Sequence, residues 1–150
     1  MKNVIGLFVL MIAIGSCKKN ETEDQAQKDR EIILQYISDN NLDAQEAEQG
    51  LFYVVNAPGT GDPCNSNSTV KTTYNGYFTN GNSFDGGTID NFALQNAIVG
   101  WQIGIPKFKE GGDGILLIPS AIGYGPNGSS SGSIPGNTVI IFDVELIKVY

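Results

Sequence analysis

One helical segment, residues 95–103, interrupts a series of strand-like runs in the C-terminal two thirds of the chain. Before it, residues 51–55 and 69–79 are rich in β-branched and aromatic side chains, as strands are. After it, residues 115–118 form a short apolar run, and residues 139–150 alternate between apolar and polar positions, which is typical of a half-buried strand. This order predicts an α+β domain of about 100 residues, with an antiparallel sheet wrapped around one short helix.

Turn signals separate these runs. Asn80-Gly81 predicts a hairpin, and a strand should continue beyond it through Ser83-Phe84-Asp85. Residues 89–94 are expected to add a further short strand, and the Gly-, Ser- and Pro-rich residues 124–137 a long exposed loop. Within the helical segment, Ile98 and Trp101 stand three residues apart and therefore on one side.

A second helix is expected near the N-terminus, within residues 29–49. Its apolar side chains follow a period close to 3.6 and form one stripe, Ile32, Ile33, Tyr36 and Ile37. Asn40-Asn41 is a plausible stop. We expect the stripe to pack on the following domain, with a dimer seam as the alternative. Residues 17–28 are almost entirely polar and predict a flexible tether.

The first residues have the pattern of an export signal. Lys2 supplies a positive charge, residues 4–14 form an apolar run, and Gly15-Ser16 precede Cys17 as in a bacterial lipobox. The run is shorter than the roughly 20 residues that span a bilayer, but it suits a signal peptide. We expect residues 1–16 to be a lipoprotein signal peptide and Cys17 to carry lipid; a buried N-terminal helix with an incidental cysteine is the alternative.

Charge and cysteine content limit the partners. The formal net charge is −7, which argues against nucleic acid, whose phosphates require Lys and Arg, so we expect no nucleic-acid partner. We expect the membrane to be reached through the lipid anchor only. With Cys17 lipidated, Cys64 has no partner within the chain. It is read as a passive loop thiol, with an intermolecular disulfide as the alternative.

The chemistry implied by the residues is shape recognition and desolvation. The chain contains no histidine, and no pair of acids stands at an obvious catalytic spacing. Aromatic residues instead recur at the ends of the predicted elements, which favours an aromatic-lined pocket. No metal and no cofactor are expected.

Six motifs, in order and spacing over roughly residues 50–150, resemble the FKBP-type peptidyl-prolyl cis-trans isomerases. They are Tyr74-Asn75-Gly76-Tyr77, Ser83-Phe84-Asp85, Ile98-Val99-Gly100-Trp101, Gly123-Tyr124-Gly125, Ile134-Pro135 and Phe142-Asp143-Val144-Glu145-Leu146. The predicted lipobox and N-terminal helix further resemble the lipoprotein FKBPs of Bacteroidetes-like bacteria, some of which are linked to gliding motility. The resemblance implies an FKBP-like antiparallel sheet curled around one short α-helix, with the isomerase domain at residues 50–150.

The resemblance also implies a site between helix and sheet, with the ring of Trp101 as its floor. The expected catalytic residues are Tyr74, Phe84, Asp85, Trp101, Tyr124 and Phe142. The expected substrate-binding residues are Phe92, Ala97, Ile98 and Ile134. By resemblance, the Ile98 N–H and the Tyr124 hydroxyl would hold substrate carbonyls, and Asp85 would stand at the polar rim. Ordinary core roles for Phe142, Trp101 and Phe92, and a turn-capping role for Asp85, remain the alternatives.

The expected function is cis-trans isomerisation of X–Pro bonds in exported polypeptides, assisting folding at the cell envelope. The expected location is lipid-anchored and periplasm-facing, at the outer membrane. Macrolide inhibitors are expected ligands through the family resemblance. The alternative function is a lipid-anchored chaperone or peptide-binding module that uses the same pocket with negligible turnover.

Overall fold

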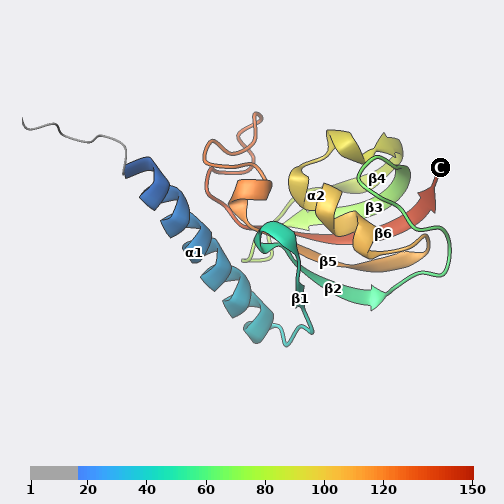
Figure 1. The fold of residues 1–150 in the computed structure, drawn as a ribbon, viewed down its shortest axis with the longest axis horizontal. Helices are drawn as coiled ribbons and strands as arrows, with labels where there is room; N and C mark the ends of the chain where they lie inside the picture. Colours follow the sequence, from blue (N-terminus) through green and yellow to red (C-terminus); the bar gives the residue numbers. More distant parts are fainter. Residues whose placement is uncertain (1–16) are drawn as a thin grey trace, which may run out of the picture.

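A computed structural model describes residues 17–150, which form a six-stranded sheet with a helix against each face (Figure 1). The signal peptide predicted for residues 1–16 lies outside the described residues. The helices and strands are α1 (Cys17–Asp39), β1 (Gln45–Glu46), β2 (Phe52–Ala57), β3 (Thr69–Tyr77), β4 (Ser83–Ala93), α2 (Val99–Gly104), β5 (Gly112–Ile118) and β6 (Ile140–Val149). Single-turn 3-10 helices lie at η1 (Glu48–Gly50), η2 (Leu94–Asn96), η3 (Ile105–Lys107) and η4 (Ser120–Ile122).

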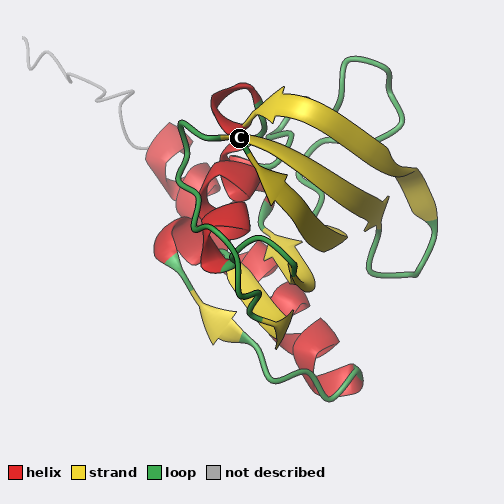
Figure 2. Cartoon of the chain, turned by 90° about the vertical axis from the view of Figure 1, so that its right-hand side faces the viewer, coloured by secondary structure: helices red, strands yellow, loops and turns green. Residues whose placement is uncertain are grey.

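The strand order is β1-β2-β5-β6-β3-β4, and every neighbouring pair is antiparallel, as the sequence predicts. The apolar run of residues 115–118 lies in β5, which pairs with β2 and β6. The C-terminal strand β6 lies between β5 and β3 and therefore joins the two halves of the sheet. Seen from the side, the strands twist strongly relative to one another (Figure 2).

The predicted hairpin between β3 and β4 is confirmed. Gly81 has a φ of 85°, which favours glycine, and its N–H donates to the Phe78 carbonyl at 2.8 Å. Residues 89–94, predicted as a separate strand, instead belong mostly to β4. A bulge allows the longer strand, because Asn91 adopts a φ of 54° where the β3–β4 register shifts.

The segment predicted as a helix over residues 95–103 is divided in two. Ala97 and Ile98 have extended ψ angles of 169° and 150°, so they separate η2 from α2. The Ile98 carbonyl then accepts from the Trp101 and Gln102 N–H groups at 3.0 and 3.2 Å and opens α2. The helix that carries Trp101 therefore begins after Ile98.

Side chains on the central strands alternate between two cores. Leu116 and Ile140 point into the core on the α2 side, whereas their neighbours Leu117 and Ile141 point into the core on the α1 side. All four are fully buried. The α2-side core contains Trp101 and is the one that positions the cavity described below.

Residues 17–28, predicted as a flexible tether, are helical in the structure and form the first half of α1. Side-chain hydrogen bonds one helical turn apart accompany this extension: Gln25 Nε2 donates to Asp29 Oδ1 at 2.7 Å, and Gln27 Nε2 to Glu31 Oε1 at 2.9 Å. The segment is also rich in Lys, Glu and Gln, which favour helices. Contact with the sheet further along α1 stabilises a helix that would be marginal alone.

At its other end α1 stops at Asp39, near the predicted stop and well before residue 49. Asn41 adopts a φ of 51°, the Asn41 N–H donates to Ser38, and the Leu42 N–H donates to Ile37, which together form a Schellman motif. Of the predicted stripe, Ile33, Tyr36 and Ile37 pack on the sheet, as expected. Ile32 is 42% exposed, because it lies at the margin of the buried stripe.

Candidate active site

A cavity of about 320 Å³ opens between α2 and the concave side of the sheet. Residues from β3, β4, the η2–α2 junction, the η4 loop and β6 line it. They are Tyr74, Asp85, Ile89, Phe92, Asn96, Ala97, Ile98, Trp101, Tyr124 and Phe142. Eight of the ten predicted site residues therefore meet in one cavity, although they are spread over almost 70 residues of chain.

Trp101 is held at the bottom of this cavity by α2 and is only 5% exposed. Gly100 and Gly104 let α2 lie close to β5: a Cβ at Gly100 would come within 2.6 Å of Ile118, and one at Gly104 within 2.7 Å of Leu116. Three aromatic rings meet the indole edge to face, a favourable arrangement. Their ring centroids lie 5.2 Å (Tyr74), 5.3 Å (Phe142) and 6.4 Å (Phe92) from that of Trp101.

The predicted alternatives of core and pocket both hold for Phe142. It alternates inward from β6 and is 3% exposed, so it is a core residue. One side of it nevertheless lines the cavity. Phe92 is only partly buried at the wall, which distinguishes it from an ordinary core aromatic.

Phe84 and Ile134 do not line the cavity with the other eight. They line an adjoining cavity of about 410 Å³, together with serines 129, 130, 131 and 133 of the η4–β6 loop. Asp85 and Tyr124 line both cavities and stand at their junction. The Phe84 ring packs edge to face against Phe142, with 5.6 Å between the ring centroids, and it lines the adjoining cavity.

Asp85 is the only carboxylate among the lining residues. Its Oδ2 accepts a hydrogen bond from the Tyr74 hydroxyl at 3.0 Å, and its Oδ1 accepts from the Gly86 N–H at 2.8 Å. Desolvation, followed by the hydrogen bond to Asp85, raises the pKa of Tyr74 above its ordinary value. The Asp85 carboxylate thus lies at the cavity rim. The predicted turn-capping role is wrong, because Gly86 and Gly87 lie within β4, where they pair with Asn75 and Tyr74 of β3.

Tyr124 follows η4 and stands between Gly123 and Gly125, of which Gly125 has a φ of 65°. The side chain is 37% exposed although it faces the cavity. Desolvation, and then the nearby charge of Asp85, raise the pKa of Tyr124, so the hydroxyl stays protonated and able to donate. Within residues 17–150 the Ile98 N–H has no hydrogen-bond acceptor, so a second donor is free at a residue that lines the cavity.

Sequence reasoning missed two lining residues, Ile89 and Asn96. Ile89 lies on the same face of β4 as Phe92 only because of the bulge at Asn91, so simple alternation hides it. Asn96 lies in η2, which the sequence does not separate from α2.

Elsewhere, burial raises the pKa of the half-buried Cys64 thiol, in keeping with an unreactive loop thiol. Among residues 17–150 no cluster of three or more His, Cys, Asp or Glu side chains could hold a metal ion.

An antiparallel sheet curled on one short helix, with an aromatic cavity between them, places the chain in the FKBP-like class of α+β domains. Residues 61–147 match the family of FKBP-type peptidyl-prolyl cis-trans isomerases. The chain belongs to this family, as the sequence motifs indicate.

Individual relatives of this chain bear the name of the same family. A probable FKBP-type peptidyl-prolyl cis-trans isomerase of Haemophilus influenzae is 32% identical, over 99% of this chain and 62% of the relative. FkpA of Aeromonas hydrophila is also 32% identical, over 91% of this chain and 52% of the relative. The chain thus spans between half and two thirds of the length of these two curated relatives.

Solved structures show the same fold. The crystal structure of a peptidyl-prolyl cis-trans isomerase from Pseudomonas syringae pv. tomato has a TM-score of 0.74 and 29% identity, and the match covers 85% of this chain and 95% of that one. The crystal structure of FkpA from Escherichia coli has a TM-score of 0.72 and 28% identity, covering 88% of this chain and 63% of that one. Both values agree with the predicted FKBP-like architecture.

Proposed function

We propose that this protein catalyses cis-trans isomerisation of X–Pro peptide bonds in exported polypeptides and so assists their folding. The observation that carries the proposal is the cavity floored by Trp101 and walled by Tyr74, Phe92 and Phe142. Its volume of about 320 Å³ lies in the usual range of small-ligand sites. Membership of the isomerase family supports the same conclusion.

Such a cavity suits rotation about an amide bond. The barrier of ~18–20 kcal/mol arises from lost resonance, and no covalent bond is made or broken. The twisted amide has less charge separation than the planar one and needs less water around its carbonyl. An apolar aromatic site therefore stabilises the transition state relative to the solvated ground state. In this mechanism the proline ring rests on the indole of Trp101, and the reaction requires no nucleophile and no cofactor.

Two donors are placed to hold the substrate backbone. The free Ile98 N–H and the protonated Tyr124 hydroxyl flank the cavity and would donate to substrate carbonyls. Both donors are positioned before substrate arrives, which lowers the entropy cost of ordering the amide. Asp85, already bonded to Tyr74, supplies the polar rim. We also expect macrolide inhibitors to occupy the cavity; Ala97 is smaller than the valine usual in the family, which leaves more room.

The test is acceleration of cis-to-trans exchange in a set of X–Pro tetrapeptides. Tyr124→Ala is the informative variant, since the ring is 37% exposed and its loss should leave the fold intact. Tyr150→Ala is the matched control, because Tyr150 is 57% exposed and does not line the cavity. We expect Tyr124→Ala to lower kcat/KM about tenfold or more, and the control to retain the full rate. Phe142→Ala is less useful, because truncating a buried Phe costs about 3–5 kcal/mol of stability.

Suppression of the rate by a macrolide would place the activity in this cavity. A folded protein that binds proline peptides without accelerating their exchange would contradict the proposed activity. It would instead support the alternative of a lipid-anchored chaperone or peptide-binding module.

We further propose that the protein is attached to the cell envelope through lipid on Cys17, facing the periplasm at the outer membrane. The support is the sequence pattern of a charged residue, an apolar run and small residues before Cys17. No helix within residues 17–150 is long and apolar enough to cross a bilayer. Cys17→Ser, expressed from the whole gene, should move the protein from the membrane to the soluble fraction. Unchanged membrane attachment of the variant would rule out the lipid anchor.

A further inference from the structure

A buried carboxyl group joins α1 to the isomerase domain. Asp29 is 1% exposed and lies where α1 passes η4. Its Oδ2 accepts from the Ser120 N–H at 2.8 Å and from the Ser120 hydroxyl at 2.6 Å, and its Oδ1 accepts from Gln25 Nε2 at 2.7 Å. Burying a carboxyl group costs free energy unless hydrogen-bond donors satisfy it. The burial of Asp29 therefore depends on these three donors staying in place.

Ser120 is in turn the residue on which the Tyr124 loop closes. Its carbonyl accepts from the Gly123 N–H at 3.1 Å and from the Gly125 N–H at 2.8 Å, one on each side of Tyr124. The Gly125 carbonyl then accepts from the Asn137 N–H at 2.9 Å, which ties the other end of the η4–β6 loop. The backbone on both sides of Tyr124 is therefore hydrogen-bonded to the Ser120 carbonyl.

The Tyr124 side chain has little packing of its own to hold it. It is 37% exposed, and the glycine on each side gives its backbone more freedom than other residues would. A donor that must meet a substrate carbonyl loses efficiency when it is displaced by an ångström. The hydrogen bonds from Asp29 to Ser120 therefore constrain the backbone that carries this side chain.

We infer that Asp29 is a positioning residue: through Ser120, α1 sets the place of Tyr124 at the cavity. The catalytic consequence of this contact rests on the proposed isomerase function, whereas its effect on the position of Tyr124 does not. On this view α1 helps to position a residue of the site, in addition to covering the face of the sheet opposite α2.

The neighbouring residue offers a matched control. Arg30 forms a paired contact with Glu46 of β1, with Nη2 3.0 Å from Oε2, and its guanidinium lies over the Phe52 ring at 5.2 Å from the centroid. Arg30 therefore also attaches α1 to the domain, but at β1 and β2 and not at η4. Comparison of substitutions at Asp29 and Arg30 therefore distinguishes two effects. Both would loosen α1, but only the substitution at Asp29 would remove its hydrogen bonds to η4.

The experiment uses residues 17–150, which contain both helices and the whole sheet. Asp29→Ala, Ser120→Ala and Arg30→Ala are each made with and without Tyr124→Phe, and kcat/KM is measured on X–Pro peptides. The proteins are also labelled with 3-fluorotyrosine, and the ¹⁹F signal of Tyr124 is assigned by its loss in Tyr124→Phe. Asp29→Asn, which keeps an acceptor for Ser120, serves as the conservative variant if Asp29→Ala does not fold.

We expect Asp29→Ala to shift or broaden the Tyr124 signal and to lower kcat/KM about tenfold. In the Tyr124→Phe background the same change should cost less than about twofold, since the two positions act through one group. Ser120→Ala should act in the same direction, Asp29→Asn should restore most of the rate, and Arg30→Ala should change neither readout.

An unmoved Tyr124 signal in folded Asp29→Ala and Ser120→Ala proteins would overturn the inference. So would an equal loss of kcat/KM with and without the Tyr124 hydroxyl, or an equal effect from Arg30→Ala. If the parent protein shows no isomerase activity, the proposed function fails, and the ¹⁹F signal alone still decides whether Asp29 positions Tyr124.

Discussion

Gly76 shows how one missing side chain shapes the aromatic wall. It lies in β3 opposite Phe142 of β6 and Asp85 of β4. A Cβ at this position would lie 2.6 Å from the Phe84 ring and 2.7 Å from the Phe142 ring. The absence of that carbon therefore lets both rings lie over the strand, and glycine is retained despite its low strand preference.

Gly76→Ala should therefore displace both rings. We expect a loss of about 1–3 kcal/mol in the free energy of unfolding from overpacking, accompanied by a lower kcat/KM. Urea denaturation and peptide isomerisation measure the two effects. Asn75→Ala is the control, since Asn75 is exposed on the other face of the same strand. Unchanged stability and turnover in Gly76→Ala would show that the rings are not confined as described.

Among the elements, α1 combines two kinds of contact with the domain. Its apolar residues Ile33, Tyr36 and Ile37 pack on the face of the sheet that α2 does not cover. Its polar residues Asp29 and Arg30 bind η4 and β1. Packing against the sheet thus stabilises the helix, and the polar contacts set how it lies on the domain.

Substitutions at two adjacent residues of α1 test whether the helix stays packed on the sheet in solution. Ile33 is fully buried, whereas Leu34 is 43% exposed. Ile33→Ala should cost about 2–5 kcal/mol of unfolding free energy, because it leaves a cavity against Leu117 and Ile141. Leu34→Ala should change it by less than about 0.5 kcal/mol. Equal, small effects in urea denaturation would mean that α1 does not stay on the sheet in solution.

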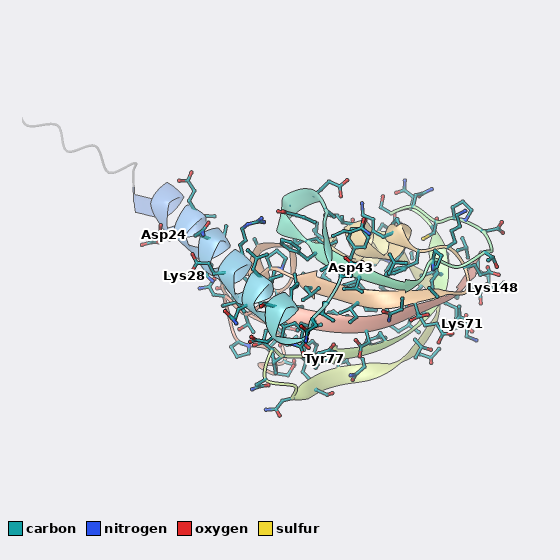
Figure 3. All side chains as sticks on the ribbon, turned by 90° about the horizontal axis from the view of Figure 1, so that it is seen from below. Asp24, Lys28, Asp43, Lys71, Tyr77 and Lys148 are labelled. Carbon is teal, nitrogen blue, oxygen red and sulfur yellow. The ribbon has the colours of Figure 1, made fainter. Side chains whose placement is uncertain are left out.

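The molecule as a whole should lose stability at alkaline pH. Tyr77, labelled in Figure 3, is half-buried and packs with the α1-side core. Desolvation, and then its hydrogen bond to Asp143 at 2.9 Å, raise the pKa of Tyr77 well above the ordinary 10. The pKa values of Tyr74 and Tyr124 are raised in the same direction.

The sign follows from proton linkage. Below pH 10, about the pKa of an unfolded tyrosine, these groups are protonated in both states, and their contribution to stability is fully present. As the pH rises further, the unfolded chain releases its protons first, so the free energy of unfolding falls. Urea denaturation between about pH 8 and pH 11 should show this fall, and Tyr77→Phe should flatten it. The same slope in the variant would exclude Tyr77 as a cause.

Much of the fold could be predicted because its signals are local. Alternation identifies β6, the Asn80-Gly81 turn identifies the β3–β4 hairpin, and the order of the runs identifies an antiparallel α+β domain. The family motifs also place most of the cavity residues, including Trp101 and Tyr124. Alternation and turn signals depend on a residue and its close neighbours in the chain, which determine backbone preference and strand period. The grouping of the cavity residues is instead what the family resemblance implies.

Contacts between distant segments had to come from the tertiary structure. The assignment of Phe84 and Ile134 to a second cavity depends on packing, and the place of Ile89 depends on a bulge. The bond from Asp29 to Ser120 joins residues 91 positions apart. Nothing near either residue in the chain indicates its partner, because only the path of the backbone brings α1 and η4 together.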